Sequence, residues 1–272
     1  MNRAVFAKAV RDALMMGLLV GLGIFFLEML IVIVMEDFTE EMQYLWLNKP
    51  FFQRFARMLL GEELGGVMSA TGLVSIGLAH PLLFAVTWAF ALVMCTRVTV
   101  AELEWGTADL LFALPIPRSR IYVSASIGWM LYGLPMILLM LAGVYAGERI
   151  APLNEPLEFA ALSKLAVNYL AFWLCVGCVT MAVASFCTRR GVAVGIVLAW
   201  LLISFLLNYL AQFSSLMERL SFVGLLHYYK PLPVIRTNAW PLSDIGFLLA
   251  LAAVSWTIGL IRFNRRDIPA AS

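Results

Sequence analysis

The chain has 272 residues, of which 62% are hydrophobic and 13% charged, with a formal net charge of +2. A soluble domain of this length could not enclose so much apolar surface in its core, so the composition excludes a water-soluble globular protein. With so small a net charge and no basic surface in the pattern, we expect no nucleic-acid partner.

Long apolar runs dominate the sequence. A bilayer-spanning helix needs about 20 mostly apolar residues, and six runs reach that length. The sequence therefore predicts an all-α integral membrane protein, with residues 1–272 forming a single transmembrane domain. The expected spans cover approximately residues 14–35, 72–95, 121–146, 161–186, 191–211 and 244–262.

Positive charges indicate which side each connection faces, because Lys and Arg in short loops favour the cytoplasmic side. With both termini inside, the inner segments hold 11 Lys and Arg in 52 residues, and the outer segments hold 8 in 86. Acidic residues lean the other way. We therefore expect both termini, and the connection between the second and third spans, in the cytoplasm. The inner segments are 1–12, 96–120, 187–190 and 262–272.

Residues 1–13 precede the first run and have the pattern of an amphipathic helix. We expect this segment to lie in the membrane interface as a helix ahead of the first span. The apolar face holds Val5, Phe6, Ala9, Val10 and Ala13, and the charged residues Arg3, Lys8, Arg11 and Asp12 lie elsewhere.

Glu28 is the one acid well inside a predicted span, where burial would cost about 2.5–3.5 kcal/mol. It should therefore not face lipid. A contact with a substrate or a cation, reached through an outer vestibule, is one interpretation. A hydrogen bond within the bundle or at the interface is the other, and the pattern favours it.

Two outer connections have short amphipathic stretches, over residues 51–60 and 212–230. We expect both to form short helices at the outer leaflet. In the second span His80 precedes Pro81, and a proline there predicts a kink. His227 lies in the last outer loop beside two tyrosines, a composition typical of the membrane interface.

The connection at residues 101–120 reads "AELEWGTADLLFALPIPRSR" and is far more polar than its neighbours. A leucine stripe and fixed acids are unusual in a plain connector, so we favour a docking surface over an ordinary amphipathic loop. On a helix Leu103, Leu110 and Leu114 would share one stripe, and Glu102 and Asp109 another face.

The same connection contains its own stop signals. Gly106 interrupts the helix at a cost of about 1 kcal/mol relative to Ala, and Pro115 and Pro117 end it. Arg118 and Arg120 follow at the membrane surface, where each has three candidate partners: anionic lipid, a carboxylate or another protein.

Small residues four apart allow close helix packing in membranes. Three glycine pairs have this spacing, and we expect them to serve packing within one chain rather than a dimer seam. They are Gly17 and Gly21, Gly143 and Gly147, and Gly191 and Gly195.

Cys175 and Cys178 form a C-x-x-C on one face of the fourth span, with Cys95 and Cys187 near inner ends. Soft metals bind thiolates, yet no His lies nearby in sequence and free Cys packs as a small hydrophobe. We therefore expect core packing, no metal site and no disulfides.

The connection at 101–120 resembles the cytoplasmic segment of type-2 ABC exporter permeases, nearest the branch associated with multicopper-enzyme maturation. The six spans, the amphipathic amino terminus, "PFFQRFARMLLG", "HPLLF" and the tail "RFNRRDI" also look like that class. One departure is the absence of a Lys in "IYVSASIGW", where family members often carry one. The matching positions are Glu102, Glu104, Gly106, Thr107, Leu110, Leu111, Pro115, Arg118 and Arg120.

The resemblance implies that these positions, with Leu103 and Asp109, couple the membrane helices to a separate ATP-hydrolysing subunit. The chain has no G-x-x-x-x-G-K-[ST] loop, so ATP and magnesium would bind the partner and this chain would hold no cofactor and no catalytic residue. Such permeases work as pairs, formed by two copies or by paralogues, in the inner (plasma) membrane. The alternative is an ATPase-coupled scaffold or mechanotransmission component that passes no solute.

Overall fold

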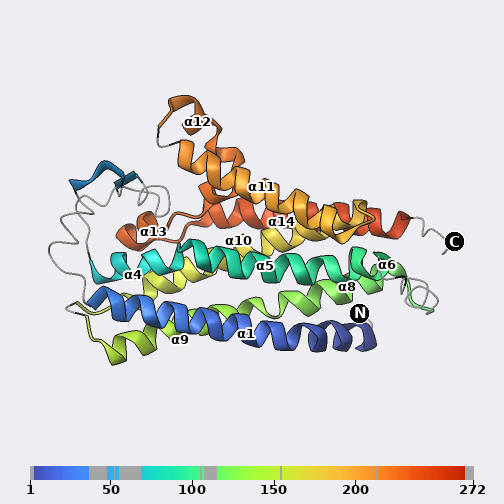
Figure 1. The fold of residues 1–272 in the computed structure, drawn as a ribbon, viewed down its shortest axis with the longest axis horizontal. Helices are drawn as coiled ribbons and strands as arrows, with labels where there is room; N and C mark the ends of the chain where they lie inside the picture. Colours follow the sequence, from blue (N-terminus) through green and yellow to red (C-terminus); the bar gives the residue numbers. More distant parts are fainter. Residues whose placement is uncertain are drawn as a thin grey trace.

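A computed structural model describes residues 3–36, 48–51, 53–54, 69–104, 106, 115–153, 155–211 and 213–266. In these residues every regular element is helical, and six helices are long and apolar enough to cross a membrane. The expected all-α membrane fold with six spans is confirmed. The long helices run side by side, and both termini lie at the same end of the bundle (Figure 1).

The spans are formed by α1, by α5 with the π turn η1, by α8 with α9, and by α10, α11 and α14. The elements in chain order are α1 (Arg3–Glu36), α4 (Ala70–Leu78), α5 (Pro81–Thr96), η1 (Arg97–Ala101), α6 (Glu102–Glu104), α8 (Arg118–Met130), α9 (Gly133–Ile150), α10 (Phe159–Phe186), α11 (Arg190–Leu210), α12 (Ser215–Leu220), η2 (Ser221–Val223), η3 (Leu225–Tyr228), α13 (Pro231–Thr237) and α14 (Leu242–Arg265).

Helix α1 differs from the expectation of a separate amino-terminal helix. Its 34 residues form one continuous helix, because the sequence between Arg3 and Glu36 contains no proline. At 1.5 Å per residue it is about 51 Å long, well beyond the ~30 Å hydrocarbon core. Its first turns therefore extend past the bilayer, which lets their charged residues avoid the hydrocarbon without a break in the helix.

The second predicted span, 72–95, has the wrong bounds. The chain breaks at His80 rather than kinking, and the span is Pro81–Ala101. Proline has no backbone N–H and fits the first position of a helix, and the His80 side chain caps α5 by accepting a hydrogen bond from Leu82 N. The preceding segment forms the separate helix α4, which packs against α1 and α13.

The third span also contains an interruption, at Leu131 and Tyr132 between α8 and α9. Pro135 explains it, because its ring would clash with the carbonyl four residues earlier. The Tyr132 hydroxyl donates a hydrogen bond to the Val10 carbonyl at 2.6 Å, which fixes the break against α1.

Helix α10 lies at the centre of the bundle and packs against α5, α9, α11 and α14. Its Tyr169 stacks with Phe84 of α5, and its Phe172 contacts Phe84 at a tilt, in a buried aromatic cluster that also contains Trp88 and Tyr229. The Tyr169 hydroxyl is 2.5 Å from Thr87 Oγ1. Cys175 and Cys178 are buried in the same helix, and all four cysteines are free, so the expectation of core packing is confirmed.

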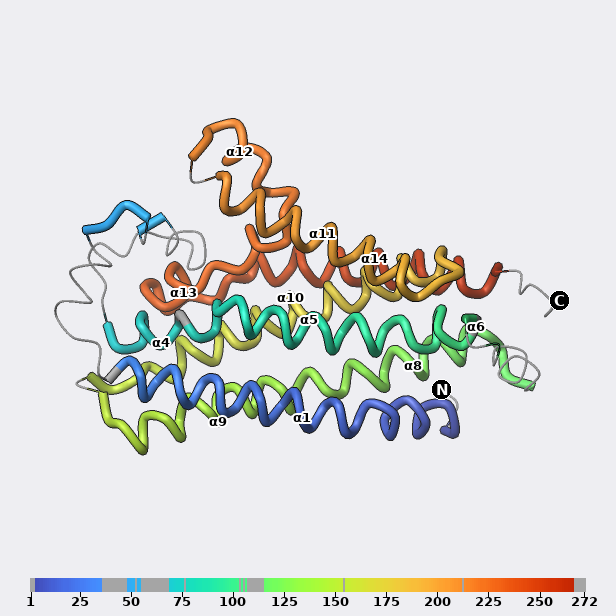
Figure 2. Tube along the Cα trace, in the orientation of Figure 1, coloured from blue at the N-terminus to red at the C-terminus, as the bar shows by residue number. Residues whose placement is uncertain are grey.

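Two of the three glycine pairs lie where α1 and α9 run side by side (Figure 2). A Cβ at Gly147 would lie 2.7 Å from Val32 Cβ, and one at Gly21 would lie 2.7 Å from Leu139 Cδ1. Packing within one chain is thus confirmed for these pairs. A Cβ at Gly191 or Gly195 would meet nothing within 4 Å, so the third pair faces outward.

At the end of the bundle away from the termini, α12, η2 and η3 form the short helices expected over 212–230. The apolar residues Leu216 and Val223 of these helices, and Phe213 just before α12, are exposed, as suits a membrane interface. Most of the other expected helix, 51–60, lies outside the described residues.

Candidate functional site

The described residues of the candidate coupling segment, 101–104, 106 and 115–120, lie at the end of the bundle where α1 begins and α14 ends (Figure 1). Helix α5 continues through η1 into α6, so Glu102, Leu103 and Glu104 extend directly from a membrane span. Among the expected coupling residues, Thr107, Asp109, Leu110 and Leu111 lie outside the described residues, as does the Leu103 side chain.

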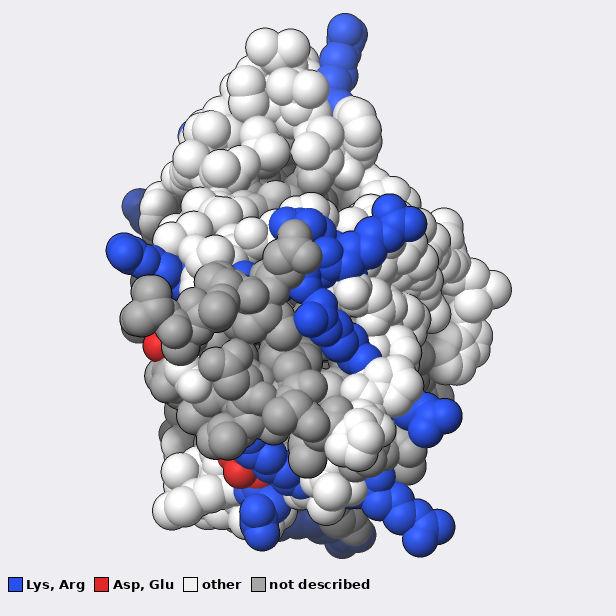
Figure 3. Space-filling view, turned by 90° about the vertical axis from the view of Figure 1, so that its right-hand side faces the viewer, with Lys and Arg blue, Asp and Glu red and all other residues white. Residues whose placement is uncertain are grey.

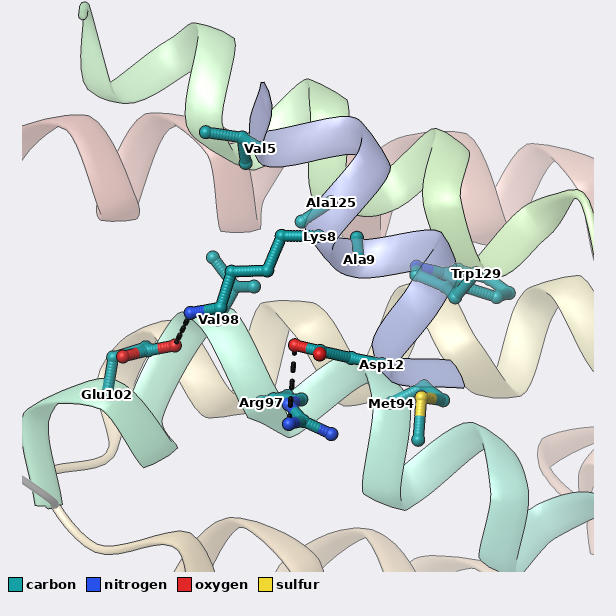
Figure 4. A pocket seen from close by; sticks show the side chains of 10 residues that line it. All are labelled: Val5, Lys8, Ala9, Asp12, Met94, Arg97, Val98, Glu102, Ala125 and Trp129. Carbon is teal, nitrogen blue, oxygen red and sulfur yellow. Dashed lines mark hydrogen bonds and ion pairs between the residues drawn. The ribbon is translucent and has the colours of Figure 1, made fainter. Parts of the chain in front are cut away.

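Two ion pairs join the first turns of α1 to this segment and to the start of η1 just before it (Figure 4). Lys8 Nζ lies 2.7 Å from Glu102 Oε1, and an Arg97 nitrogen lies 3.3 Å from Asp12 Oδ2. The Glu102 side chain is only 7% exposed, so it faces α1 rather than the surface. A small pocket of about 30 Å³ lies between the two pairs.

The π turn explains how both pairs form. Lys8 and Asp12 are four residues apart and therefore share one face of α1. Their partners Arg97 and Glu102 are five apart, a spacing that would separate them on an α-helix. In η1 the Glu102 N–H donates to the Arg97 carbonyl, and this i→i+5 bond places the two residues one above the other.

Glu104 makes a second link, to the start of α11. Its Oε2 accepts a hydrogen bond from the Arg190 N–H at 2.8 Å. A carboxylate is favoured there, because the first N–H groups of a helix have no partner within it and carry partial positive charge. Glu104 is otherwise exposed, which leaves it accessible to another protein.

The remaining described residues of the segment mark its bends. Gly106 has a φ of 71°, a left-handed conformation that glycine adopts without strain. Pro115 is exposed, and Pro117 stands directly before α8, which begins at Arg118. Arg120 is exposed, whereas Arg118 donates a hydrogen bond to the Arg266 carbonyl.

Arg266 is a functional candidate that the sequence pattern did not reveal, because it reads as one more basic residue in the tail. The residue is 8% exposed, and its guanidinium donates to the carbonyls of Thr99, Ala184 and Cys187. Burial, and secondarily Arg262, lowers the pKa of Arg266. One side chain therefore joins the end of α14 to η1 and to the end of α10.

Basic side chains gather around this end of the bundle, with few acidic ones among the described residues there (Figure 3). The distribution agrees with the positive-inside pattern of the sequence. Comparisons with protein-family models, with curated proteins and with solved structures find no match.

Glu28 is completely buried in the bundle. A Cβ at Gly77 would collide with its Oε2, and one at Gly143 would lie 3.1 Å from its Cβ, so the side chain is packed between α4 and α9. Among the described residues neither carboxylate oxygen has a hydrogen-bond partner. The bundle-facing interpretation is confirmed in position, but the described residues supply no hydrogen bond to the carboxyl group.

We expect Glu28→Met to stabilise the protein, because a buried polar group without a hydrogen bond costs about 1–3 kcal/mol and Met fills a similar elongated space. Thermal unfolding in detergent is followed with a thiol-reactive dye, since all four free cysteines are buried when the chain is folded. Glu28→Gln, which stays polar, should unfold close to the wild type. A lower unfolding temperature for Glu28→Met would show that the carboxyl group has a partner.

No group of three His, Cys, Asp or Glu residues suited to a metal ion occurs in the described part of the chain. His80 caps α5, and His227 Nδ1 lies 3.1 Å from Ser221 Oγ. Burial, and secondarily Lys230, lowers the pKa of His227. Both histidines therefore have local structural contacts.

Proposed function

We propose that this chain is the membrane-spanning subunit of an ATP-driven transporter of the type-2 ABC class, most simply an exporter in the inner (plasma) membrane. In this proposal a separate ATPase binds ATP and magnesium and docks on residues 101–120. A second permease subunit, identical or a paralogue, completes the pathway.

The observation that carries the proposal is the number of spans tied to this short segment. Glu102 links it to α1 through Lys8, and Glu104 links it to α11 through the Arg190 N–H. At its other end Arg118 reaches the Arg266 carbonyl beyond α14. Movement of the segment by a soluble partner would therefore act on several spans together, as switching between inward and outward openings requires.

Within the proposal the two acids have different tasks. Glu102 is buried against Lys8, so it positions the segment. Glu104 is exposed, so it is the acid that the ATPase would touch. Both acids are among the expected coupling positions, and in this proposal one positions the segment and the other contacts the ATPase.

We expect Glu104→Lys to release the ATPase while the permease stays folded. The tagged chain is purified from native membranes in mild detergent, and the eluate is assayed for magnesium-dependent ATP hydrolysis and, by mass spectrometry, for a chain with a phosphate-binding loop. Glu104→Gln keeps an acceptor for the Arg190 N–H but loses the negative charge. It should retain an amount of ATPase between those of the wild type and Glu104→Lys.

The matched control is Glu218→Lys, because Glu218 is an exposed acid on α12 at the opposite end of the bundle. It should retain the ATPase. Retention by Glu104→Lys, or absence of any ATP-hydrolysing companion from the wild-type eluate, would refute the proposal.

A further inference from the structure

An apolar groove with a volume of about 460 Å³ runs along the surface of the bundle between α5 and α11. This lies within the usual range for small-molecule sites. Phe84, Trp88 and Leu92 form its buried floor, and Leu198 and Leu202 of α11 form an exposed wall. All the residues that line it are apolar or aromatic, so its occupant must be apolar too.

The groove is deep because two small residues lie along it. Ala85 and Ala89 are four apart on α5, line the groove and remain exposed. In membrane bundles such pairs usually admit a neighbouring helix. Here α11 does not fill the space above them.

The length of the groove matches one leaflet. On α5 it extends from Pro81 to Val93, and on α11 from Val194 to Phe205, which corresponds to about 16–18 Å at 1.5 Å per residue. The hydrocarbon core is about 30 Å thick. A single acyl chain, which is elongated and about half the bilayer in length, fits these dimensions.

One end of the groove is marked by positive charge. Arg190 lies one turn before Val194, on the same face of α11 as Leu198 and Leu202. Its Nε donates to Thr96 Oγ1 at 3.0 Å and its second guanidinium nitrogen to the carbonyl of Val93, a groove residue, at 3.2 Å. The adjacent Arg189 is exposed. Two arginines at the mouth of an apolar groove complement a lipid phosphate.

We propose that the groove binds one acyl chain of an anionic phospholipid, with the headgroup phosphate held by Arg189 and Arg190. The headgroup end of the site lies on the side of the two termini, and the groove extends from there past the middle of α5 and α11. This lipid site is independent of the proposed transport function, because a lipid bound in the groove would bridge α5 and α11 whether or not the chain moves a solute.

The probe is phosphatidylglycerol with a diazirine at the end of one acyl chain, added to the purified chain in phosphatidylcholine nanodiscs. After illumination we expect labelled peptides from α5 and α11. Unlabelled phosphatidylglycerol should compete, and extra phosphatidylcholine should not. Labelling elsewhere, or equal competition by the two lipids, would overturn the proposal.

Groove-filling variants test the acyl part of the site. Ala85→Phe and Ala89→Phe should reduce labelling of α5 and α11 to the level without illumination, and because both positions are exposed the variants should fold. Ala253→Phe, at an exposed position of α14, is the matched control and should label like the wild type. Undiminished labelling in both groove variants would contradict binding of the acyl chain in the groove.

Charge variants test the headgroup part. Arg190→Gln and Arg189→Gln should each reduce the preference for phosphatidylglycerol about fivefold, since one basic residue near a membrane surface contributes about 1 kcal/mol. Arg190→Lys should retain it. If the preference survives both glutamine variants, the arginines do not hold the headgroup.

A second copy of the chain is the competing occupant, and a cysteine variant distinguishes it. Leu198→Cys should form no disulfide-linked dimer under oxidising conditions in native membranes, because lipid rather than a second copy covers this wall. Formation of a Leu198→Cys crosslinked dimer would assign the groove to a second copy and overturn the lipid site.

Discussion

Substitution of Gly143 by Ala is expected to lower the free energy of unfolding by about 3 kcal/mol, the upper range for an overpacked site. A Cβ at Gly143 would collide with the Phe25 carbonyl oxygen and would lie 3.1 Å from Glu28 Cβ. The Phe25 carbonyl oxygen belongs to the backbone, so no change of side-chain rotamer can relieve this collision. Helices α1 and α9 would have to move apart along their whole contact.

The other glycines provide graded controls for the same thiol-dye unfolding assay. At Gly21 the nearest atom to a new Cβ is a terminal methyl of Leu139, which can move, so Gly21→Ala should cost less than Gly143→Ala. A Cβ at Gly195 meets nothing, and Gly195→Ala should be neutral or stabilising by up to about 1 kcal/mol from helix propensity. Equal effects at Gly143 and Gly195 would contradict the assigned packing of α1 against α9.

The glycine pairs also show the limit of sequence reasoning about this fold. All three have the same spacing, yet two lie in a helix contact and the third faces outward. Spacing records which residues share a helix face, but not what lies opposite that face. The six spans could be predicted because length and hydropathy alone define them, and the bounds of the second were wrong because proline can begin a helix as well as bend one.

The candidate site was less predictable for a related reason. The polar segment at 101–120 is visible in the sequence, but its anchors are distant in the chain: Lys8 pairs with Glu102 from 94 positions away. The π turn that aligns Arg97 with Glu102 has no recognised sequence signal. The spacing of Lys8 and Asp12, opposite charges four residues apart, was the one local clue that they share a face.

Substitution of Arg266 by Ala is expected to open the junction of α14, η1 and α10. The guanidinium donates to three carbonyls on two elements, and hydrogen bonds from charged groups contribute about 1.5–3 kcal/mol each. Water at the end of the bundle can replace some of these hydrogen bonds, so we expect the free energy of unfolding to fall by about 3 kcal/mol in total. Arg266→Lys should recover only part of the lost stability, because a single ammonium group lacks the planar guanidinium that reaches several acceptors.

Cys187 gives a local readout of that opening, since its carbonyl accepts from Arg266 and its thiol is nearly buried. The rate at which a maleimide labels Cys187 below the unfolding temperature, mapped by peptide mass spectrometry, should rise in Arg266→Ala. Burial raises the pKa of Cys187, and the charge of Arg266 lowers it. Removing that charge alone would raise the pKa further and slow labelling, because the thiolate is the reactive form.

Faster labelling can therefore come only from structural opening, and slower labelling would mean that Arg266 acts on Cys187 through charge alone. The control is Arg265→Ala, which removes an exposed neighbouring charge and should change neither the labelling rate nor the unfolding temperature. Because Arg266 also contacts η1 through the Thr99 carbonyl, the proposed coupling predicts that Arg266→Ala retains less of the ATPase than Arg265→Ala does. Loss of the junction with full ATPase retention would separate the stability of this end of the bundle from its proposed docking role.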